Sequence, residues 1–325
     1  MSRWNALLLP IFFLTTPSLA ETGETSPAEA IPSIPDDPTP GPESMEYPGI
    51  QRLFLPTTFY ADHTYQRSSD LSTMAWVRGS GKNYRVGLGA IFKFDAWNFS
   101  VELPVQYTQL TIDKLQGQDP DPADRTKGAL SLGDLLLGTT YGFKTSAGPV
   151  DLSLGAGLRV RVPTHTMKFA FRLINGGAIE FGIPYYLHTS PTIIARAALG
   201  PLAFTMNQGV LGMFSKDLDL GGIPQPVPTI YFWESHYALS LTGLGPLTVW
   251  TELSYCHQLN SIQVVNFERV NGIDALSLQP GLALRMDRYL LIAEGRIGLT
   301  KATQDLGIVA FSGNHAFVVR LAYRY

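Results

Sequence analysis

The sequence predicts an all-β fold: a transmembrane antiparallel up-and-down β-barrel of about 12 strands, within a range of about 10 to 14. Three observations predict it. Short runs of residues alternate between apolar and polar with the period of a β-strand. The connections between these runs alternate between tight and long, and the last run is an amphipathic strand that continues to Tyr325.

The alternation is clearest in two runs. From Asn98 to Thr108, the odd-numbered residues are apolar or aromatic and the others are mostly polar. From Val150 to Arg161, the even-numbered residues are apolar up to Val160, while Asp151 and two arginines belong to the opposite face. Such strands place one face against an apolar surrounding and the other against water.

Runs of this kind, bounded by turn residues, predict 12 strands, with ends uncertain by a few residues. They lie near 51–62, 84–94, 97–110, 130–143, 149–161, 191–199, 201–212, 229–243, 246–258, 274–286, 288–299 and 315–325.

The tight connections are predicted at Asp95-Ala96, Lys144 to Gly148, Gly200, Leu244-Gly245 and Asp287. The long ones are predicted at 63–83, 111–129, 162–190, 213–228, 259–273 and 300–314. Transmembrane barrels place short turns in the periplasm and long loops outside, and an even strand number leaves both termini in the periplasm. A soluble β-sandwich, the main alternative fold, has no reason to sort its connections by length.

Three segments are expected along the chain. Residues 1–20 resemble a cleaved signal peptide, with Arg3 before an apolar run and small residues before Glu21. Residues 21–48 are expected to be a disordered, proline-rich, acidic periplasmic segment, because the stretch 21–47 contains seven acids and no Lys or Arg. Residues 49–325 form the expected barrel, which places the protein in the outer membrane of a Gram-negative bacterium.

Composition excludes several classes of protein. The net charge is −3, from 24 basic and 27 acidic residues, so a nucleic-acid partner is not expected. Cys256 is the one cysteine, which excludes an intramolecular disulfide framework. Hydrophobic residues make up 45% of the chain without any run long enough for a transmembrane helix, so strands must carry the apolar surface.

The final strand carries a predicted insertion signal. Its outward row resembles the C-terminal signal that the barrel-insertion machinery reads, and consists of Phe317, Val319, Leu321, Tyr323 and Tyr325. Because open sheet edges are not tolerated in hydrocarbon, the first strand is expected to pair with the last. This makes the stretch 53–60 a neighbour of 317–325.

The inward faces of the strands are predicted to line the lumen with charges of both signs. The expected lumen-lining residues are Arg85, Lys93, Glu102, Asp134, Asp151, Arg159, Arg161, Arg196, Glu234, His236, Glu252, Arg285, Glu294, Arg296 and Arg320. Mixed charge fits either a wet conduit or a salt-bridged plug of side chains. Small residues on the same faces, such as Gly87, Gly89, Gly155 and Gly157, favour the conduit.

Motifs for catalysis are weak, and no catalytic residue, cofactor or metal ligand is predicted. Ser235 and His236 are adjacent, so their side chains belong to opposite faces of a strand. His257 lies near Ser261 at a strand end, where a polar loop rim is the better explanation. The acidic residues of 118–124 are a possible weak cation site, but a solvated loop is favoured.

Residues 131–143, Ser-Leu-Gly-Asp-Leu-Leu-Leu-Gly-Thr-Thr-Tyr-Gly-Phe, resemble a strand motif of the outer-membrane family known as meta-pathway phenol-degradation transporters, and the likeness continues to 161–164. The resemblance implies passage of hydrophobic or aromatic small molecules, and supplies no binding residues. Leu136 would face the lumen with Trp250, Leu290 and Ile292. These four residues form either an oily stripe for an aromatic solute or packing beneath a plug.

The leading hypothesis is a porin-like outer-membrane channel or transporter for small molecules, hydrophobic or aromatic ones among them. Its partners would be outer-membrane lipid, the barrel-insertion machinery and the small-molecule solute; the oligomeric state stays open. The alternatives are a structural or adhesive barrel with a plugged lumen and, as a second alternative, an outer-membrane barrel hydrolase. The absence of catalytic motifs favours a protein that is not an enzyme.

Overall fold

The structure is a computed structural model of the chain. It describes residues 50–68, 77–115, 119–164, 168–182, 186–215, 218–220, 223–225, 229–260, 262–263, 269–270, 274–300 and 315–325. The predicted signal peptide and the predicted acidic segment 21–48 lie outside these residues.

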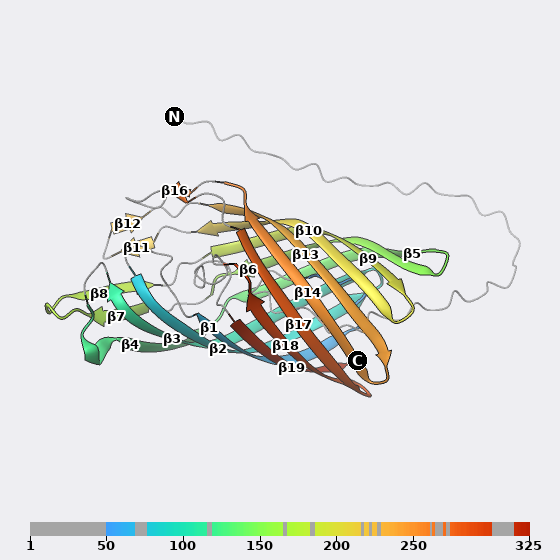
Figure 1. Cartoon of the computed structure of the whole chain (residues 1–325), viewed down its shortest axis with the longest axis horizontal. Helices are drawn as coiled ribbons and strands as arrows, with labels where there is room; N and C mark the ends of the chain where they lie inside the picture. The colour runs from blue at the N-terminus through green and yellow to red at the C-terminus, as the bar shows by residue number, and fades with distance from the viewer. Residues whose placement is uncertain are drawn as a thin grey trace, which may run out of the picture. The chain divides into compact units, whose positions relative to one another are not determined.

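The strands form one closed antiparallel ring (Figure 1). Its 12 members, in chain order, are β1 (Thr58–Ser68), β2 (Val77–Phe94), β3 (Trp97–Leu115), β5 (Leu135–Ala147), β6 (Val150–Val162), β9 (Tyr186–Leu199), β10 (Leu202–Ser215), β13 (Ile230–Leu244), β14 (Leu247–Gln258), β17 (Asp274–Met286), β18 (Tyr289–Gly298) and β19 (His315–Arg324). Each strand pairs with its neighbours in sequence, and β1 pairs with β19, which closes the barrel. The predicted fold class and strand number are confirmed.

The predicted first strand is wrong in its position. The sequence placed it at 51–62, whereas β1 begins at Thr58 and pairs from Thr58 opposite Arg324 to Arg67 opposite His315. Residues 50–57 are not part of the ring. Their apolar residues fit the alternation of a strand, but they are buried inside the barrel, as described below.

The five tight connections lie where the alternation of loop lengths predicted them. They are Asp95-Ala96, Gly148-Pro149, Gly200-Pro201, Gly245-Pro246 and Asp287-Arg288. The first residue of each turn has a positive φ, between 53° at Asp95 and 69° at Gly245. Glycine and aspartate tolerate this conformation, and proline at the second position supplies the negative φ that follows. We call this end of the barrel the turn end and the opposite end the loop end.

The long connections contain short elements that the sequence did not predict. β4 (Thr126–Leu132) pairs with the loop-end part of β3 and is separated from β5 at Gly133-Asp134. Three small hairpins and one short helix complete the loops: β7 (Lys168–Arg172) with β8 (Ala178–Gly182), β11 (Leu218–Leu220) with β12 (Ile223–Gln225), β15 (Ile262–Gln263) with β16 (Arg269–Val270), and the 3₁₀ helix η1 (Pro122–Asp124). Both β2 and β3 also extend farther toward the loop end than predicted.

The outer face of the barrel is apolar and ends in two levels of aromatic side chains. Trp97 and Tyr141 contact each other near the turn end, and Tyr65, Tyr84 and Tyr107 contact in sequence nearer the loop end. Trp97 and Tyr107 lie ten residues apart on β3, which is about 34 Å along the strand and about 26 Å when the strand is tilted. That height matches the apolar band of an outer-membrane barrel. Among the residues that the structure describes, no helix has the length and apolar composition needed to cross a bilayer.

The outer face gives a direct test of membrane contact. Leu103 lies midway along β3 and exposes 46% of its surface. We expect Leu103→Arg to lower the free energy of unfolding in lipid vesicles by about 2–4 kcal/mol, because a guanidinium group then lies in hydrocarbon. Denaturant titration in vesicles measures this. A loss no larger than that of Leu103→Ala would contradict the lipid-facing assignment.

Candidate functional site: the filled lumen

Residues 50–57, which we call the lumen segment, lie inside the ring. The main-chain N–H of Ile50 donates to Glu252 Oε1 at 3.0 Å, and the amide of Asn207 donates to the carbonyl of Gln51 at 3.1 Å. Glu252 belongs to β14 and Asn207 to β10, and both point inward. These two strands therefore hold the start of the lumen segment through its backbone.

Strands across the ring hold the rest of the lumen segment. Asn98 of β3 binds Leu55 twice, accepting from its N–H at 3.1 Å and donating to its carbonyl at 2.7 Å. The hydroxyl of Thr140 on β5 donates to the carbonyl of Arg52 at 3.4 Å. Because β3 and β5 lie far around the ring from β14, the segment crosses the lumen.

Inward-facing glycines receive the side chains of the lumen segment. A Cβ at Gly142 would lie 2.9 Å from Leu53 Cδ1, and one at Gly155 would lie 2.8 Å from Leu53 Cδ2. A Cβ at Gly157 would collide with the side-chain amide of Gln51. Gly155 and Gly157 were expected to leave room for a conduit; in the structure that room is taken by the chain itself.

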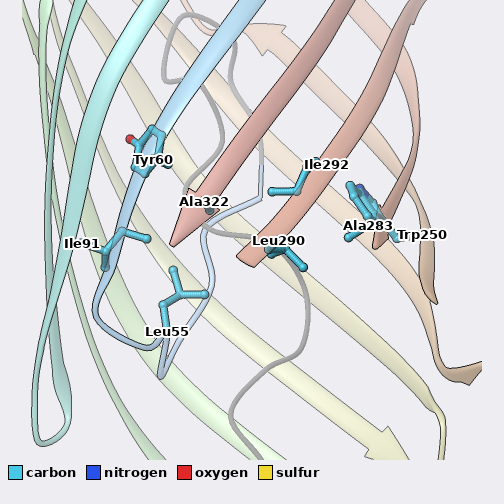
Figure 2. Packing of buried hydrophobic residues seen from close by; sticks show 8 residues of the cluster. All are labelled: Leu55, Tyr60, Ile91, Trp250, Ala283, Leu290, Ile292 and Ala322. Atoms are coloured by element: carbon cyan, nitrogen blue, oxygen red, sulfur yellow. The ribbon is translucent and has the colours of Figure 1, made fainter. Parts of the chain in front are cut away.

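An apolar layer fills the barrel near the turn end (Figure 2). It consists of Leu55, Tyr60, Ile91, Trp250, Ala283, Leu290, Ile292 and Ala322. Leu55 of the lumen segment is one member, and the others point inward from the wall. Trp250, Leu290 and Ile292 therefore pack against the lumen segment, as one of the two interpretations of the oily stripe expected, while Leu136 is buried outside this cluster.

Ion pairs occupy the lumen beside the apolar layer. Arg85 of β2 contacts Glu102 of β3 and lies 3.5 Å from Asp62 of β1. Asp62 also accepts from Arg320 of β19 at 3.3 Å, and Tyr60 donates its hydroxyl to Glu102 at 2.7 Å. All of these side chains are buried. Four neighbouring strands are thus joined across their inner faces.

A second polar group lies on the inner faces of β13 and β14. The ring of His236 contacts Glu234 through Nε2 at 3.2 Å and Ser254 through Nδ1 at 2.9 Å. Ser254 donates to Glu252 at 2.8 Å. Arg159 of β6 donates to Glu234 at 3.3 Å. The group thus extends from β6 to the carboxylate that holds Ile50.

We call the buried lumen charges the lumen belt. Its acids and bases are equal in number: Asp62, Glu102, Glu234, Glu252 and Glu294 with Arg52, Arg85, Arg159, Arg296 and Arg320. Arg52 comes from the lumen segment, so the segment contributes to this balance. A buried, neutral and hydrogen-bonded belt is a salt-bridged filling, and the lumen in this conformation is not the wet conduit that the small inward residues favoured.

A small cavity of 40 Å³ lies between the lumen segment and the wall. Its lining includes Gln51, Leu55, Asn98, Thr140 and Arg159. That volume holds about three water molecules. The lumen segment therefore fits the wall closely but not completely.

Asp134 and Arg161 form a separate pair nearer the loop end. Asp134 follows the break between β4 and β5, and its Oδ2 accepts from Arg161 Nε at 2.5 Å. Its Oδ1 accepts from the main chain of Thr164 at 3.2 Å. The Gly-Asp of the resemblance motif therefore ties β5 to the end of β6, which is a structural role.

The remaining predicted lumen residues lie at the turn end. Their side chains are half-buried or, for Arg285, exposed; they are Lys93, Asp151, Arg196 and Arg285. Sequence analysis missed several partners in the lumen, namely Tyr60, Asp62, Asn98, Ser190, Asn207, Ser254 and Gln279. The two-residue period of β1, taken from Thr58 instead of Gln51, would have placed Tyr60 and Asp62 on the inner face.

The histidines behave as structural groups. Ser235 and His236 do face opposite sides, and the partner of His236 is Ser254 on the next strand, which sequence spacing does not reveal. His236 and Glu234 are fully buried, so a substrate does not reach them in this conformation. His257 binds Asp274 at 2.8 Å near the loop end. Within the described ranges, no group of three His, Cys, Asp or Glu side chains is placed to hold a metal ion.

The acidic loop is also bound up in contacts within the protein. Asp121 accepts from the main chain of Ala123 at 3.0 Å, which caps the helix η1. The hydrogen bond from Lys127 to Asp124, 2.7 Å long, lowers the pKa of the Asp124 carboxyl below its usual value. Asp124 also accepts from the main chain of Arg172. These carboxylates serve the loop, as the solvated-loop interpretation expected.

Comparison with known proteins places the fold. No family model matches the chain, and no curated protein matches its sequence. The COG4313 outer membrane channel from Pseudomonas putida F1 is similar in structure, with a TM-score of 0.56 and 9% identity over 88% of this chain and 100% of that one. The translocator domain of the autotransporter NalP from Neisseria meningitidis gives a TM-score of 0.50 and 12% identity over 83% of this chain and 89% of that one. The chain therefore has the fold of bacterial outer-membrane barrels.

Proposed function

We propose that the protein is an outer-membrane channel for small hydrophobic or aromatic molecules, exported by a cleaved signal peptide and inserted through its C-terminal strand. The observation that carries the proposal is the lumen segment. It fills a closed barrel, yet it is attached by hydrogen bonds and packing, with no covalent link to the wall outside its own chain connection. A filling of this kind can move aside.

The apolar layer supports the class of solute. When Leu55 moves away, the inner faces of Tyr60, Ile91, Trp250 and Leu290 lose their packing partner and line an apolar pocket. Aromatic and aliphatic walls of this kind bind apolar solutes, and the nearby polar groups of the lumen belt give orientation. The same residues would exclude a strongly hydrated ion.

Uptake into vesicles whose outer leaflet contains lipopolysaccharide tests the proposal. We expect the protein to increase the flux of 1-naphthol over protein-free vesicles, and Leu290→Glu to reduce that flux by about tenfold because it places a charge in the apolar layer. Leu291→Ala, a change on the outer face of the same strand, is the matched control and should leave the flux unchanged. Equal flux with and without protein would contradict the proposal.

The balanced lumen belt favours one second candidate, a structural barrel with a permanently filled lumen. Buried ion pairs that span neighbouring strands stiffen the wall and leave no path. This candidate predicts that neither 1-naphthol nor a small sugar crosses the wall, and that loosening the lumen segment lowers stability without creating a flux.

A further inference from the structure

Inward-pointing cations gather at the turn end of the barrel. We call this group the turn-end rim; its cations are Lys93, Lys144, Arg196, Arg285 and Arg324. They come from β2, β5, β9, β17 and β19, which are spread around the ring. Asp151 of β6 is the one inward-pointing acid at this level among the described residues. The rim therefore has a strong excess of positive charge.

The lumen belt does not explain this excess. Its five carboxylates are matched by five guanidinium groups, so its charges balance without the rim. The rim cations lie on the inner side of the wall, away from the apolar outer face that lipid would cover. A partner for the rim must therefore approach from the lumen or from the solvent at the turn end.

The acidic segment that precedes the lumen segment has the complementary charge. Residues 21–47 hold seven carboxylates and no Lys or Arg. The chain also contacts the rim where the description begins: Lys144 Nζ lies 4.6 Å from the centre of the Phe54 ring, and the main chain of Lys93 donates to the Thr57 hydroxyl at 3.2 Å. The rim and this part of the chain are continuous.

The length of the segment suffices to reach the rim. Ile50 is bound to Glu252, which lies five residues into β14 and so about 17 Å along the strand from the turn end. Thirteen residues separate Asp37 from Ile50, and a proline-rich stretch of that length spans about 40 Å. The barrel is about 24 Å across. Covalent attachment also gives the segment an effective concentration of about a millimolar at the rim.

We infer that the acidic segment 21–49 docks on the turn-end rim through its carboxylates, and so covers this mouth of the barrel. The docking is electrostatic, because a proline-rich stretch with few apolar residues has little surface to bury. It is therefore weakened by salt, which screens exposed charges within about 8–10 Å near physiological ionic strength. This inference concerns the mouth of the barrel and does not depend on transport.

Spin-label mobility in the full mature chain tests the inference. A nitroxide on Thr39→Cys reports the segment, while the buried Cys256 stays unlabelled. We expect slow label motion at low salt and fast motion at about 0.5 M salt. The rim variant Lys93→Glu/Arg285→Glu/Arg324→Glu should show fast motion at both. A gel shift between boiled and unboiled samples confirms that each variant is folded.

A charge swap and a matched control complete the test. Asp36→Lys/Asp37→Lys/Glu43→Lys/Glu46→Lys, added to the rim variant, should restore slow motion at low salt. The control Arg67→Glu/Lys114→Glu/Arg172→Glu makes the same charge change on exposed residues at the loop end and should leave the label slow.

Three results would overturn the inference. The first is equal label motion in the wild type and the rim variant. The second is a charge swap that fails to restore slow motion, which would indicate that the rim holds another partner. The third is slow motion in phosphatidylcholine nanodiscs that disappears in phosphatidylglycerol nanodiscs, which would assign the rim to lipid phosphate.

Discussion

Deletion of residues 21–55 is expected to raise the single-channel conductance by about an order of magnitude. The deletion removes the lumen segment and keeps Pro56 and Thr57, whose carbonyl groups accept from Thr58 and Tyr325 at the start of the ring. It also removes Arg52, so the lumen belt is left with one uncompensated carboxylate. The current should therefore become more selective for cations.

Planar bilayers measure both effects. Deletion of residues 21–35 is the matched control, because it shortens the same terminus and retains the lumen segment; its conductance should stay close to that of the full chain. If the 21–55 deletion folds, shown by its gel shift on boiling, and conducts no better than this control, the lumen segment does not close the barrel.

The second large effect is expected at Arg85. Arg85→Met is expected to lower the free energy of unfolding by about 3–5 kcal/mol, because it leaves Glu102 and Asp62 buried beside each other without the guanidinium group between them. Methionine keeps much of the volume, so the loss reports the charge more than a cavity. Denaturant titration of the protein in lipid vesicles measures the change.

Arg67 supplies the control for this measurement. It lies near the loop end of β1 and is exposed, so Arg67→Met should change the free energy of unfolding by no more than about 0.5 kcal/mol. Similar losses for the two variants would show that the Arg85 cluster is hydrated and contributes little. The lumen belt would then be a wet conduit after all.

The strand pattern of the ring could be predicted from the sequence because lipid and lumen impose opposite polarity on alternate residues. β17, Asp274–Met286, has the predicted limits, since it is bounded by a tight turn at Asp287 and carries a clean alternation. β2 and β3 were predicted too short. Their loop-end parts include Gly79, Ser80 and Gly81, which carry no apolar row, and cross-strand hydrogen bonds alone extend the pairing there.

The lumen segment could not be predicted, because an apolar residue packed inside a barrel has the same sequence signal as one facing lipid. Leu53 and Leu55 were therefore assigned to the first strand. Their true partners, such as Gly142 and Trp250, are distant in sequence and are identified only by the closed ring. The inward glycines were recognised as empty space, but the sequence does not say what fills it.

The charges show the same division between face and partner. Alternation assigns Arg159 and Glu234 to inner faces, but their contact depends on the ring order β6–β9–β10–β13, which places them across three strand junctions. His236 was compared with its chain neighbour Ser235, whereas its hydrogen bond goes to Ser254 on the adjacent strand. Register decides these pairs, and register is set by the turns and the closure together.

A disulfide between the lumen segment and the wall tests the central claim most directly. A Cβ at Gly142 would lie within 2.9 Å of Leu53 Cδ1, so Leu53→Cys/Gly142→Cys should cross-link under mild oxidation in protein that shows the gel shift of a folded barrel. Mass spectrometry of the unreduced digest should find the peptide that joins positions 53 and 142. The same peptide should be absent from the control Leu53→Cys/Ser277→Cys, whose second cysteine lies on β17. If the folded protein yields no linked peptide, or if the control links as readily, residues 50–57 do not fill this barrel as described.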